Sequence, residues 1–335
     1  MALHPAVAVV RRGVRAALAD LDPADTVVVA VSGGPDSMAL ASAAIFEGRK
    51  RSLRVIGATV DHALQLDSAE VAAATAERLA ALGADETATI AVRVDDPDRA
   101  GPEGAARRAR YAALEQYAAH AGARVVLLGH TRDDQAETVL LGLARGSGPR
   151  SIAGMRRSFA PTAGAAGALT FRRPLLDVSR DDTVTACQVE GIEVWHDPHN
   201  DDPGYARVRV RRTVLPVLEE QLGPGIAHTL ARTADQVRAD TELLDAIAES
   251  EWRGLGEALP AGVLAGFPDA IRTRILRLAA LAAGAIAAEL TYEHVRALDG
   301  LVTGWRGQRW IDLPGPLRAV RTGDAIAFQP ALSDP

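Results

Sequence analysis

The residues best suited to chemistry form one short loop: Ser32, Gly33, Gly34, Pro35, Asp36 and Ser37. Its glycines let backbone N–H groups approach a ligand closely, and the helix expected after it would direct a positive amino end toward an anion. The serine hydroxyls add further hydrogen-bond donors. Asp36 would repel a bare phosphate, but a divalent cation could join the carboxylate to the phosphate. The loop therefore predicts a site for phosphate groups and a metal ion.

This loop differs from the two commonest nucleotide-binding motifs. The Walker pattern GxxxxGKS or GxxxxGKT is absent, and Lys50 is the only lysine in the chain. GxGxxG is absent as well. A bland alternative remains, in which a Gly-Gly turn is followed by a helix that Asp36 or Ser37 caps. The position of the loop, between the apolar run Thr26–Val31 and a helical pattern, favours the phosphate site.

A second polar segment, GHTRDDQAET, covers residues 129–138 and follows another apolar run. His130 is thereby expected at the carboxyl end of a strand. Asp134 and Glu137 are three residues apart on the helix expected next, so they share a face and could hold Mg²⁺ on phosphate groups. The alternative is a helix cap, because Asp-x-x-Glu at a helix start resembles a capping box. If Asp133 is the cap, the other two carboxylates stay available for a metal.

Two further groups could extend the site. Asp61 and His62 follow the second expected strand, at the edge where an open α/β sheet binds ligands. Taken alone, they would be interpreted as a polar strand end. Arg107, Arg110 and Tyr111 belong to one helical pattern, and the two arginines are three residues apart on one face. An exposed arginine helix explains them equally well.

These side chains are positioned by strand patterns that alternate with helical ones. Strands are expected over Thr26–Val31, Leu53–Val60, Glu86–Val94 and Val125–Gly129, and helices over Ser37–Gly48, Ser68–Leu82, Gly104–Ala121, Asp133–Leu143 and Ser179–Glu190. Ser179 is the expected N-cap residue of the last of these helices. Such alternation is typical of a parallel sheet covered by helices. The predicted fold is therefore α/β, with an open, mostly parallel sheet and helices on both faces.

The chain changes character after residue 222. Gly223-Pro224-Gly225 is the best candidate linker. Helical patterns dominate beyond it, over 226–251, 269–283 and 291–302, and short strands are expected within 308–329. We predict two domains, 1–222 and 223–335, of which the second is smaller and mainly helical.

Composition excludes several classes of protein. The net charge is −6, from 37 Lys and Arg against 43 Asp and Glu, which excludes a chain that is basic throughout but not a local basic face. The single cysteine, Cys187, excludes an internal disulfide framework and cysteine-rich metal sites. It fits a reducing, cytoplasmic setting. We expect no signal peptide and no membrane span, because no stretch approaches ~20 apolar residues.

The motifs together resemble a known family. SGGPDS resembles the pyrophosphate loop of the PP-loop ATP pyrophosphatase superfamily. GHTRDDQAET, the segment Arg145-Gly146-Ser147-Gly148 and the run DPHNDDPGYARVRVR at 197–211 are similar to the tRNA(Ile)-lysidine synthetases within it. The similarity extends from Thr26 to about Leu218 and includes Arg173-Pro174-Leu175-Leu176 and Ser179-Arg180. The chain departs from the family pattern in two places. It has Asp197-Pro198-His199-Asn200 where a turn of aspartate, serine and asparagine is usual, and Arg207-Val208 where Arg-Asn is usual.

The resemblance implies a reaction and its partners. The cofactors would be ATP and Mg²⁺, and the substrates free lysine and an isoleucine tRNA with the anticodon CAU. Cytidine O2 would attack the α-phosphate and release pyrophosphate, after which the lysine amine would displace AMP at C2. The resemblance also suggests a homodimer, and it makes the domain 1–222 the ATP-binding catalytic domain and 223–335 a tRNA-contacting or structural one.

Residue roles follow from the same resemblance. The loop 32–37 would bind the pyrophosphate, and a carboxylate set would hold Mg²⁺: Asp36, Asp134 and Glu137. His130 and Arg110 would contact the phosphate or the adenylated base. Four weaker candidates for binding substrate or phosphate are Asp61, His62, Arg107 and Arg207, the last of which would bind a phosphate bidentately.

Three rival classes are less consistent with the residues. A tRNA thiolation enzyme needs paired cysteines, whereas Cys187 is alone on a helical pattern and suits a small buried position. An amidotransferase-fed synthetase needs a glutaminase nucleophile, for which no candidate is found. A non-enzymatic nucleotide sensor would need the loop but not the paired carboxylates.

A concentration of arginines suggests an RNA surface. Seven arginines and one carboxylate, Asp177, lie between Arg145 and Arg180, and four more arginines lie within 207–212. Our hypothesis is that some of them, Arg156 and Arg157 included, form a basic rim that holds the anticodon stem through phosphate contacts. The alternative is a solvated face whose arginines pair with the acidic loop 197–202.

Overall fold

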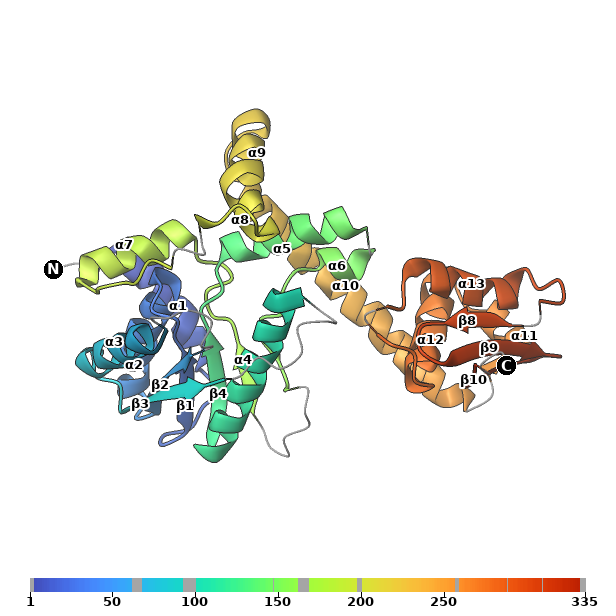
Figure 1. The fold of residues 1–335 in the computed structure, drawn as a ribbon, viewed down its shortest axis with the longest axis horizontal. Coiled ribbons are helices and arrows are strands. Elements are labelled where there is room, and N and C mark those ends of the chain that lie inside the picture. Colours follow the sequence, from blue (N-terminus) through green and yellow to red (C-terminus); the bar gives the residue numbers. More distant parts are fainter. Residues whose placement is uncertain are drawn as a thin grey trace. The chain divides into compact units, whose positions relative to one another are not determined.

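The computed structural model describes residues 3–61, 68–92, 101–146, 148–161, 169–197, 201–256, 259–287, 289–308 and 310–331, with backbone alone at 101–103. The chain forms two compact units (Figure 1). The first comprises Met1–Leu141 and Met155–Arg232, and the second Gly142–Gly154 and Thr233–Pro335. The linker predicted at residues 223–225 forms the turn between two helices, and the first unit continues beyond it to Arg232.

In the part of the chain that the structure describes, a six-stranded sheet forms the centre of the first unit. Its order is β3-β2-β1-β4-β6-β5, with β1 Thr26–Ala30, β2 Arg54–Asp61, β3 Glu86–Ala91, β4 Ala123–Leu128, β5 Ser158–Phe159 and β6 Thr170–Arg172. Every pairing is parallel except that of β5 with β6. The predicted mostly parallel α/β fold is confirmed.

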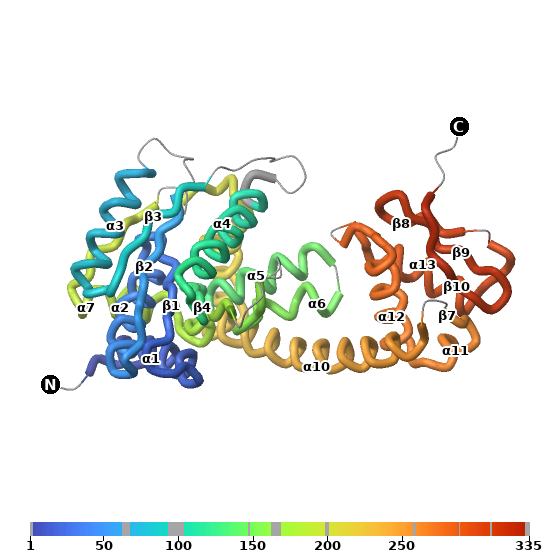
Figure 2. The backbone as a smooth tube through the Cα atoms, turned by 90° about the horizontal axis from the view of Figure 1, so that it is seen from below, coloured from blue at the N-terminus to red at the C-terminus, as the bar shows by residue number. Residues whose placement is uncertain are grey.

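Helices cover both faces of this sheet. On one face lie α1 Pro5–Ala17, α2 Pro35–Lys50, α3 Ser68–Leu82 and α7 Arg180–Glu190, and on the other lies α4 Gly101–His120. The chain further forms α5 Arg132–Arg145, α8 Ala206–Arg209 and α9 Leu215–Leu222, whereas α6 Pro149–Ile152 belongs to the second unit. The backbone trace shows α1, α2 and α7 beside one another, in agreement with their mutual packing (Figure 2). A π-helical turn, Val210–Val214, separates α8 from α9, although the apolar pattern over residues 209–222 predicts one continuous helix.

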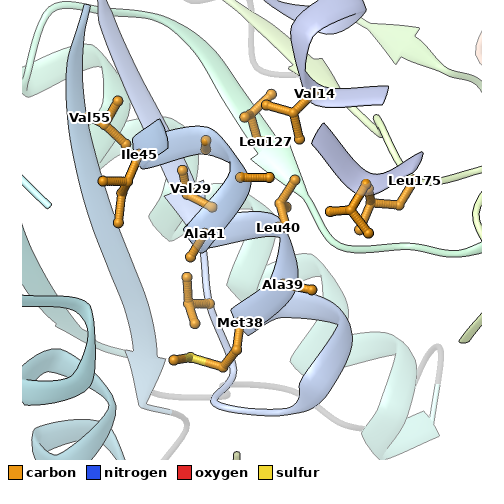
Figure 3. Close-up of a cluster of buried hydrophobic side chains, with 14 of the residues drawn as sticks. Val14, Val29, Met38, Ala39, Leu40, Ala41, Ile45, Val55, Leu127 and Leu175 are labelled. Carbon is orange, nitrogen blue, oxygen red and sulfur yellow. The ribbon is translucent and has the colours of Figure 1, made fainter. Parts of the chain in front are cut away.

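The core follows from the alternation of side chains along β1. Val27 and Val29 face α1, α2 and α7, whose apolar side chains close around them (Figure 3). Val28 points to the opposite face and packs with Leu114 and Ala118 of α4. Full burial of such side chains contributes roughly 1.5–3 kcal/mol each. Because the strand is apolar on both faces, its carboxyl end and the loop after it are held firmly in place.

The sequence analysis missed some elements. It did not predict α1, although Ala6, Val7, Val10 and Val14 repeat at helical spacing and are all buried. It also missed β5 and β6, which are too short to show a period. The other strands and helices of the alternating half lie close to their predicted ranges.

The second unit combines helices with a small antiparallel sheet. Its elements are α10 Ile226–Leu255, which begins in the first unit, β7 Leu259–Pro260, α11 Ala261–Ala265, α12 Asp269–Ala282, α13 Tyr292–Thr303, β8 Ile311–Leu313, β9 Leu317–Thr322 and β10 Ala325–Pro330. The four-stranded sheet of the described residues has the order β7-β10-β9-β8. The predicted helices and the short strands near the end are confirmed. Among the described helices, none is long and apolar enough to cross a membrane.

Candidate functional site

The site begins where β1 and β4 end side by side. The two strands pair in parallel, yet β1 leads to β2 on its other side. Neighbouring parallel strands whose connections diverge leave a crevice at their carboxyl ends, which is the usual ligand site of open α/β sheets. The loop 32–37 follows β1, and residues 129–131 follow β4. The two polar segments singled out in the sequence therefore meet at one edge.

The loop after β1 has the conformation that its glycines permit. Gly33 has φ +84°, and its carbonyl accepts a hydrogen bond from the Trp195 N–H at 2.8 Å. A Cβ atom at Gly33 would lie 2.8 Å from Thr75 Oγ1, so a larger residue would meet both steric and backbone strain. Ser37 Oγ accepts from the Ser32 N–H at 3.1 Å and donates to the Gly34 carbonyl at 2.9 Å. The loop is thus closed on itself.

The first turn of α2 lacks the side-chain cap that the bland alternative requires. Gly34 is the N-cap residue, and no side-chain cap bond is formed there. Pro35 begins the helix, where its missing N–H costs nothing. Neither Asp36 nor Ser37 caps α2, and its positive amino end is suited to an anion.

Gly129 allows the turn after β4 to approach this helix end. A Cβ atom at that position would lie 3.1 Å from Ser37 Cα and 3.3 Å from the Asp36 carbonyl carbon. Any side chain there would push the two turns apart. The glycine therefore sets how closely His130 and α5 approach the loop.

Three carboxylates from two helices converge on one arginine. Arg180 Nη2 donates to Asp134 Oδ1 at 2.8 Å, and Nη1 donates to Glu137 Oε1 at 3.2 Å. The Arg180 Nε lies 3.5 Å from Asp36 Oδ2. The predicted set of carboxylates is therefore brought together, but around a guanidinium.

Arg180 is itself placed by the start of α7. Ser179 is the N-cap residue and forms a capping box with Asp182, as the sequence indicated for Ser179. The backbone N–H of Arg180 donates to Asp133 Oδ2 at 2.8 Å. Thr183, one turn along, donates its hydroxyl to Asp36 Oδ1. The amino end of α7 thus contacts both α2 and α5.

Glu137 lies at the centre of an arginine cluster. Its side chain is 0% exposed. Arg211 Nε and Nη2 donate to its two oxygens at 2.7 and 3.2 Å, and Arg207 Nη1 lies 3.5 Å from Oε2. Arg207 and Arg211 are four residues apart and reach Glu137 from α8 and the π-helical turn, a rare element that is frequent at functional sites.

The capping alternative for α5 is partly correct. Asp134 Oδ2 accepts from the Thr131 N–H at 2.8 Å and from its hydroxyl at 3.1 Å, so Asp134 stabilises the helix start. Asp133 faces α7 instead of capping α5. Glu137 takes no part in the cap, because its contacts are with arginines. Asp134 therefore combines a structural role with a place in the cluster.

Burial and charge act in opposite directions on these carboxyls. Burial raises the pKa of Asp36 to about 6, although the nearby Arg180 guanidinium lowers it. Burial also raises the pKa of Asp134, but Arg180 and His130 outweigh that effect and the pKa of Asp134 is lowered overall. The pKa of Arg180 is raised, because its three carboxylate neighbours outweigh the effect of burial. The ionised cluster is thus held by the arginine.

The arrangement does not fit a bound Mg²⁺ ion as it stands. Carboxylate oxygens are suitable ligands for Mg²⁺. However, no group of three or more His, Cys, Asp or Glu side chains in the described part of the chain is placed to hold a metal. The oxygens of Asp36, Asp134 and Glu137 already accept hydrogen bonds or face arginines. The predicted metal site stays a prediction.

His130 belongs to a second group beside the cluster. Its Nδ1 accepts from Arg173 Nε at 3.3 Å, and Arg173 Nη2 donates to the Tyr111 hydroxyl at 3.1 Å. Arg107 Nη2 donates to the same hydroxyl at 3.3 Å. The rings of Tyr111, Phe159 and Phe171 pack together around this group. Burial lowers the pKa of His130, so the imidazole is neutral near pH 7.

The remaining candidates are placed less closely. Arg110 lies one turn from Arg107 on the exposed side of α4. Asp61 is the last residue of β2, at the strand end where it was predicted but one residue inside the strand. His62 and residues 198–200 lie outside the described residues, as does Ser147. The roles of Arg110 and Asp61 stay predictions.

Sequence reasoning missed several residues that build the site. Arg173 and Arg180 belong to segments that carry the family resemblance, 173–176 and 179–180, but no role was predicted for either of them, and Arg211 was predicted only as part of an arginine run. The signal for Arg180 was its position after a predicted N-cap serine, at a helix start that could face the loop. Nothing in the sequence pointed to Thr183, which contacts Asp36.

The arginines proposed as a basic rim are partly paired. Arg157 Nη1 and Nη2 bind the two Asp177 oxygens at 2.5 and 2.8 Å. Arg212 pairs with Asp201 of the acidic loop, and Arg209 binds backbone carbonyls nearby. The alternative interpretation therefore holds for Arg212. Cys187 is buried against α2, as predicted, and burial raises the pKa of its thiol to about 12.

A parallel sheet with an SGGPDS loop after one strand and carboxylates after its neighbour defines the PP-loop class of ATP-binding proteins. Residues 8–218 match the model of the PP-loop domain, and residues 259–325 match that of the TilS substrate binding domain. A solved structure, the U34-tRNA thiolase NcsA from Methanococcus maripaludis with its [4Fe-4S] cluster, has the same fold, with TM-score 0.56 and 17% identity. The similarity covers 70% of this chain and 80% of that one.

Within this class, the chain belongs to the tRNA(Ile)-lysidine synthase family. It is 53% identical to the tRNA(Ile)-lysidine synthase of Thermobifida fusca over 320 residues, which cover 95% of each chain. It is 46% identical to that of Streptomyces coelicolor, over 98% of this chain and 99% of the other. For the protein of Salinispora tropica the identity is 48%, over 98% of both chains. The family expected from the motifs is confirmed.

Proposed function

We propose that this chain attaches lysine to C2 of the wobble cytidine in an isoleucine tRNA with the anticodon CAU, at the expense of ATP. One observation carries the proposal. The SGGPDS loop and the carboxylate cluster meet at the carboxyl ends of β1 and β4, in a chain 53% identical to a tRNA(Ile)-lysidine synthase over nearly its whole length. A thiolation reaction is disfavoured, because the chain has one cysteine and that cysteine is buried.

The proposed reaction has two displacement steps. Cytidine O2 attacks the α-phosphorus of ATP, the bond to the β-phosphate oxygen breaks, and pyrophosphate leaves. The side-chain amine of lysine, after loss of its ammonium proton, attacks C2, and the bond between C2 and O2 breaks to release AMP. The cytidine must leave its stack to reach a protein site, as in other enzymes that modify a base.

The loop 32–37 supplies donors to the leaving pyrophosphate. Its backbone N–H groups and the amino end of α2 would stabilise the charge that develops there. Arg207 is placed near the cluster and could bind a phosphate bidentately if its weak contact with Glu137 opened. We expect Mg²⁺ to accompany ATP. It would neutralise phosphate charge when bound, and the carboxylates predicted to hold it, Asp36, Asp134 and Glu137, face Arg180 in the present arrangement.

Partners and location complete the proposal. The second unit, which carries the region similar to the TilS substrate binding domain, would contact tRNA. Free lysine would be the second substrate. We place the reaction in the cytoplasm, where tRNA, ATP and lysine occur together, and keep the homodimer as an expectation from the family.

The decisive experiment follows one nucleoside. The protein is incubated with ATP, Mg²⁺, lysine and isoleucine tRNA, and the wobble nucleoside is then analysed by mass spectrometry. We expect cytidine to gain one lysine with loss of one water, and AMP to form only when lysine is present. A matched tRNA with uridine at the wobble position should gain nothing. An unmodified cytidine, or one that has gained sulfur, would refute the proposal.

A further inference from the structure

One buried guanidinium, that of Arg173, organises the group around His130. Its Nε donates to His130 Nδ1 at 3.3 Å, and its Nη2 donates to the Tyr111 hydroxyl at 3.1 Å. The third nitrogen, Nη1, donates to the carbonyl of Arg156 at 2.5 Å. All three nitrogens of this planar, forked guanidinium therefore donate hydrogen bonds, to a ring nitrogen, a carbonyl and a hydroxyl.

The orientation of this fork is fixed. Arg173 is 7% exposed, and its guanidinium lies 4.5 Å from the centre of the Phe159 ring. Its backbone N–H donates to the carbonyl of Arg157 at 2.8 Å, directly after β6. A planar fork with three hydrogen bonds and a ring contact cannot rotate without loss of several of them.

Arginine chemistry then determines where the proton of His130 lies. A guanidinium stays protonated in proteins and can only donate hydrogen bonds. Nδ1 of His130 must therefore be the acceptor, and in a neutral imidazole the proton is then on Nε2. A cation at hydrogen-bond distance also disfavours a second proton on the ring. The tautomer of His130 therefore follows from its hydrogen bond with Arg173.

We propose that Arg173 is a positioning residue that holds His130 as the Nε2–H tautomer, so that His130 serves the reaction as a hydrogen-bond donor and not as a general base. With Nε2 already protonated and Nδ1 occupied, the ring has no free position for a proton from the lysine ammonium. Its N–H can instead stabilise negative charge that develops on the phosphate oxygens or on departing AMP. This last step alone rests on the proposed function.

The location of His130 suits that role. It follows β4 directly, next to the loop 32–37, to which Gly129 brings the chain within van der Waals contact. The charges that act on the ring are those of Asp134, Arg173, Arg107 and Arg207. His130 thus lies between the carboxylate cluster and the aromatic group.

The tautomer can be measured directly. In the full-length protein labelled with ¹⁵N-histidine, the ring nitrogens are observed by NMR and His130 is assigned by difference with His130→Gln. We expect the Nε2–H tautomer in the wild type and a substantial Nδ1–H population in Arg173→Met. Arg172→Met is the matched control, because the neighbouring Arg172 turns to Asp20 and the Ala17 carbonyl. Nδ1–H in the wild type, or no change in Arg173→Met, would overturn the proposal.

Activity distinguishes a donor from a base. The Gln amide N–H₂ occupies nearly the position of Nε2–H, whereas that of Asn lies nearer Nδ1. Relative to wild type, His130→Ala should slow pyrophosphate release by ~100-fold. His130→Gln should recover about a tenth of the wild-type rate, and His130→Asn should recover none. If Gln is as inactive as Ala, the donor role is wrong.

The two proposals fail separately. If the wild type releases no pyrophosphate with tRNA and ATP, the proposed function is wrong, while the NMR result still decides the tautomer. If Arg173→Met does not fold, as circular dichroism would show, the wild-type spectrum and the His130 variants decide alone.

Discussion

At the scale of single residues, Asp36 is held in a state that favours function over stability. It is mostly buried, and its pKa is raised to about 6 from the usual 3.8. The native state binds this proton more tightly than the unfolded chain does. Ionisation of Asp36 therefore costs stability as the pH rises from about 4 to about 6, and the cost is complete above that range.

We accordingly expect Asp36→Asn to be more stable than wild type at pH 8 and equal to it near pH 4. The gain should be at most ~3 kcal/mol, from one pKa unit being worth about 1.4 kcal/mol. Pyrophosphate release should nevertheless be lost. Urea unfolding at several pH values measures the first effect and a single-turnover assay the second.

Asp177→Asn is the control of opposite sign, because the pKa of Asp177 is lowered by its hydrogen bonds with Arg157. That substitution should cost stability above about pH 4, and only slightly, since the pair is exposed. An Asp36→Asn protein that is less stable than wild type at pH 8 would contradict the burial argument.

Glu137 presents the reverse case, a buried charge that is fully paired. Three arginines face it, and none of its side chain is exposed. Glu137→Gln would leave Arg180, Arg207 and Arg211 with one negative charge too few. We expect a loss of ~3 kcal/mol or more in the free energy of unfolding, measured by urea unfolding. A metal-binding role alone would predict lost activity with an unchanged melting temperature.

The matched control is Glu193→Gln. Glu193 pairs with Arg78 at 3.3 Å, but its side chain is 82% exposed. Its removal should cost less than about 1 kcal/mol. Equal costs for the two substitutions would show that the arginine cluster does not depend on Glu137.

At the scale of elements, the start of α7 connects helix stability with the site. Ser179 caps this helix, and the next residue is Arg180, which holds the carboxylate cluster. Ser179→Ala should cost ~1 kcal/mol of stability and should also slow pyrophosphate release, because the first turn that carries Arg180 loosens. Thermal unfolding and the single-turnover assay are measured on the same samples.

Thr291→Ala provides the comparison, because Thr291 forms a capping box with His294 at the start of α13 in the second unit. It should cost a similar ~1 kcal/mol and leave pyrophosphate release from unit 1 unchanged. If both substitutions slow the reaction equally, general destabilisation explains the effect, and the cap of α7 has no special role.

At the scale of the whole molecule, the chain is acidic but is proposed to bind a polyanion. Arg156 and Arg157 belong to the stretch with seven arginines and one carboxylate. Replacing both with Ala should weaken tRNA binding and reduce the slope of log K against log salt by ~0.7–0.9 for each lost phosphate contact. ATP affinity should change little. Filter binding at several salt concentrations measures both quantities.

The pairing of Arg157 sharpens this test. Asp177 binds the two terminal nitrogens of Arg157, Nη1 and Nη2, so Asp177→Asn should release the arginine and strengthen tRNA binding. For the variant that replaces both Arg156 and Arg157 with Ala, Arg54→Ala is the control. Arg54 forms a similarly exposed ion pair with Glu86 at the opposite edge of the sheet. An unchanged salt slope in the double variant would remove these two arginines from the RNA surface.

The sequence by itself determined the loop, most strands and helices around it, and the family. Each of these depends on local patterns: glycines beside an apolar strand, periods of 2 and 3.6, and a serine before α7. Asp36, Asp134 and Glu137 could be selected because carboxylates beside an anion site are unusual. The short strands β5 and β6 could not, since two or three residues carry no period.

The tertiary structure alone decided which charges meet. Arg180 binds Asp134 from 46 residues away, and Arg173 binds His130 from 43. Both contacts depend on the strand order, which places β6 beside β4, and on the packing of α7 against α2. The charge of the three carboxylates predicted a cation between them. That this cation is the Arg180 guanidinium depends on which side chains are buried together. Burial is a property of the assembled sheet and helices, and no local pattern encodes it.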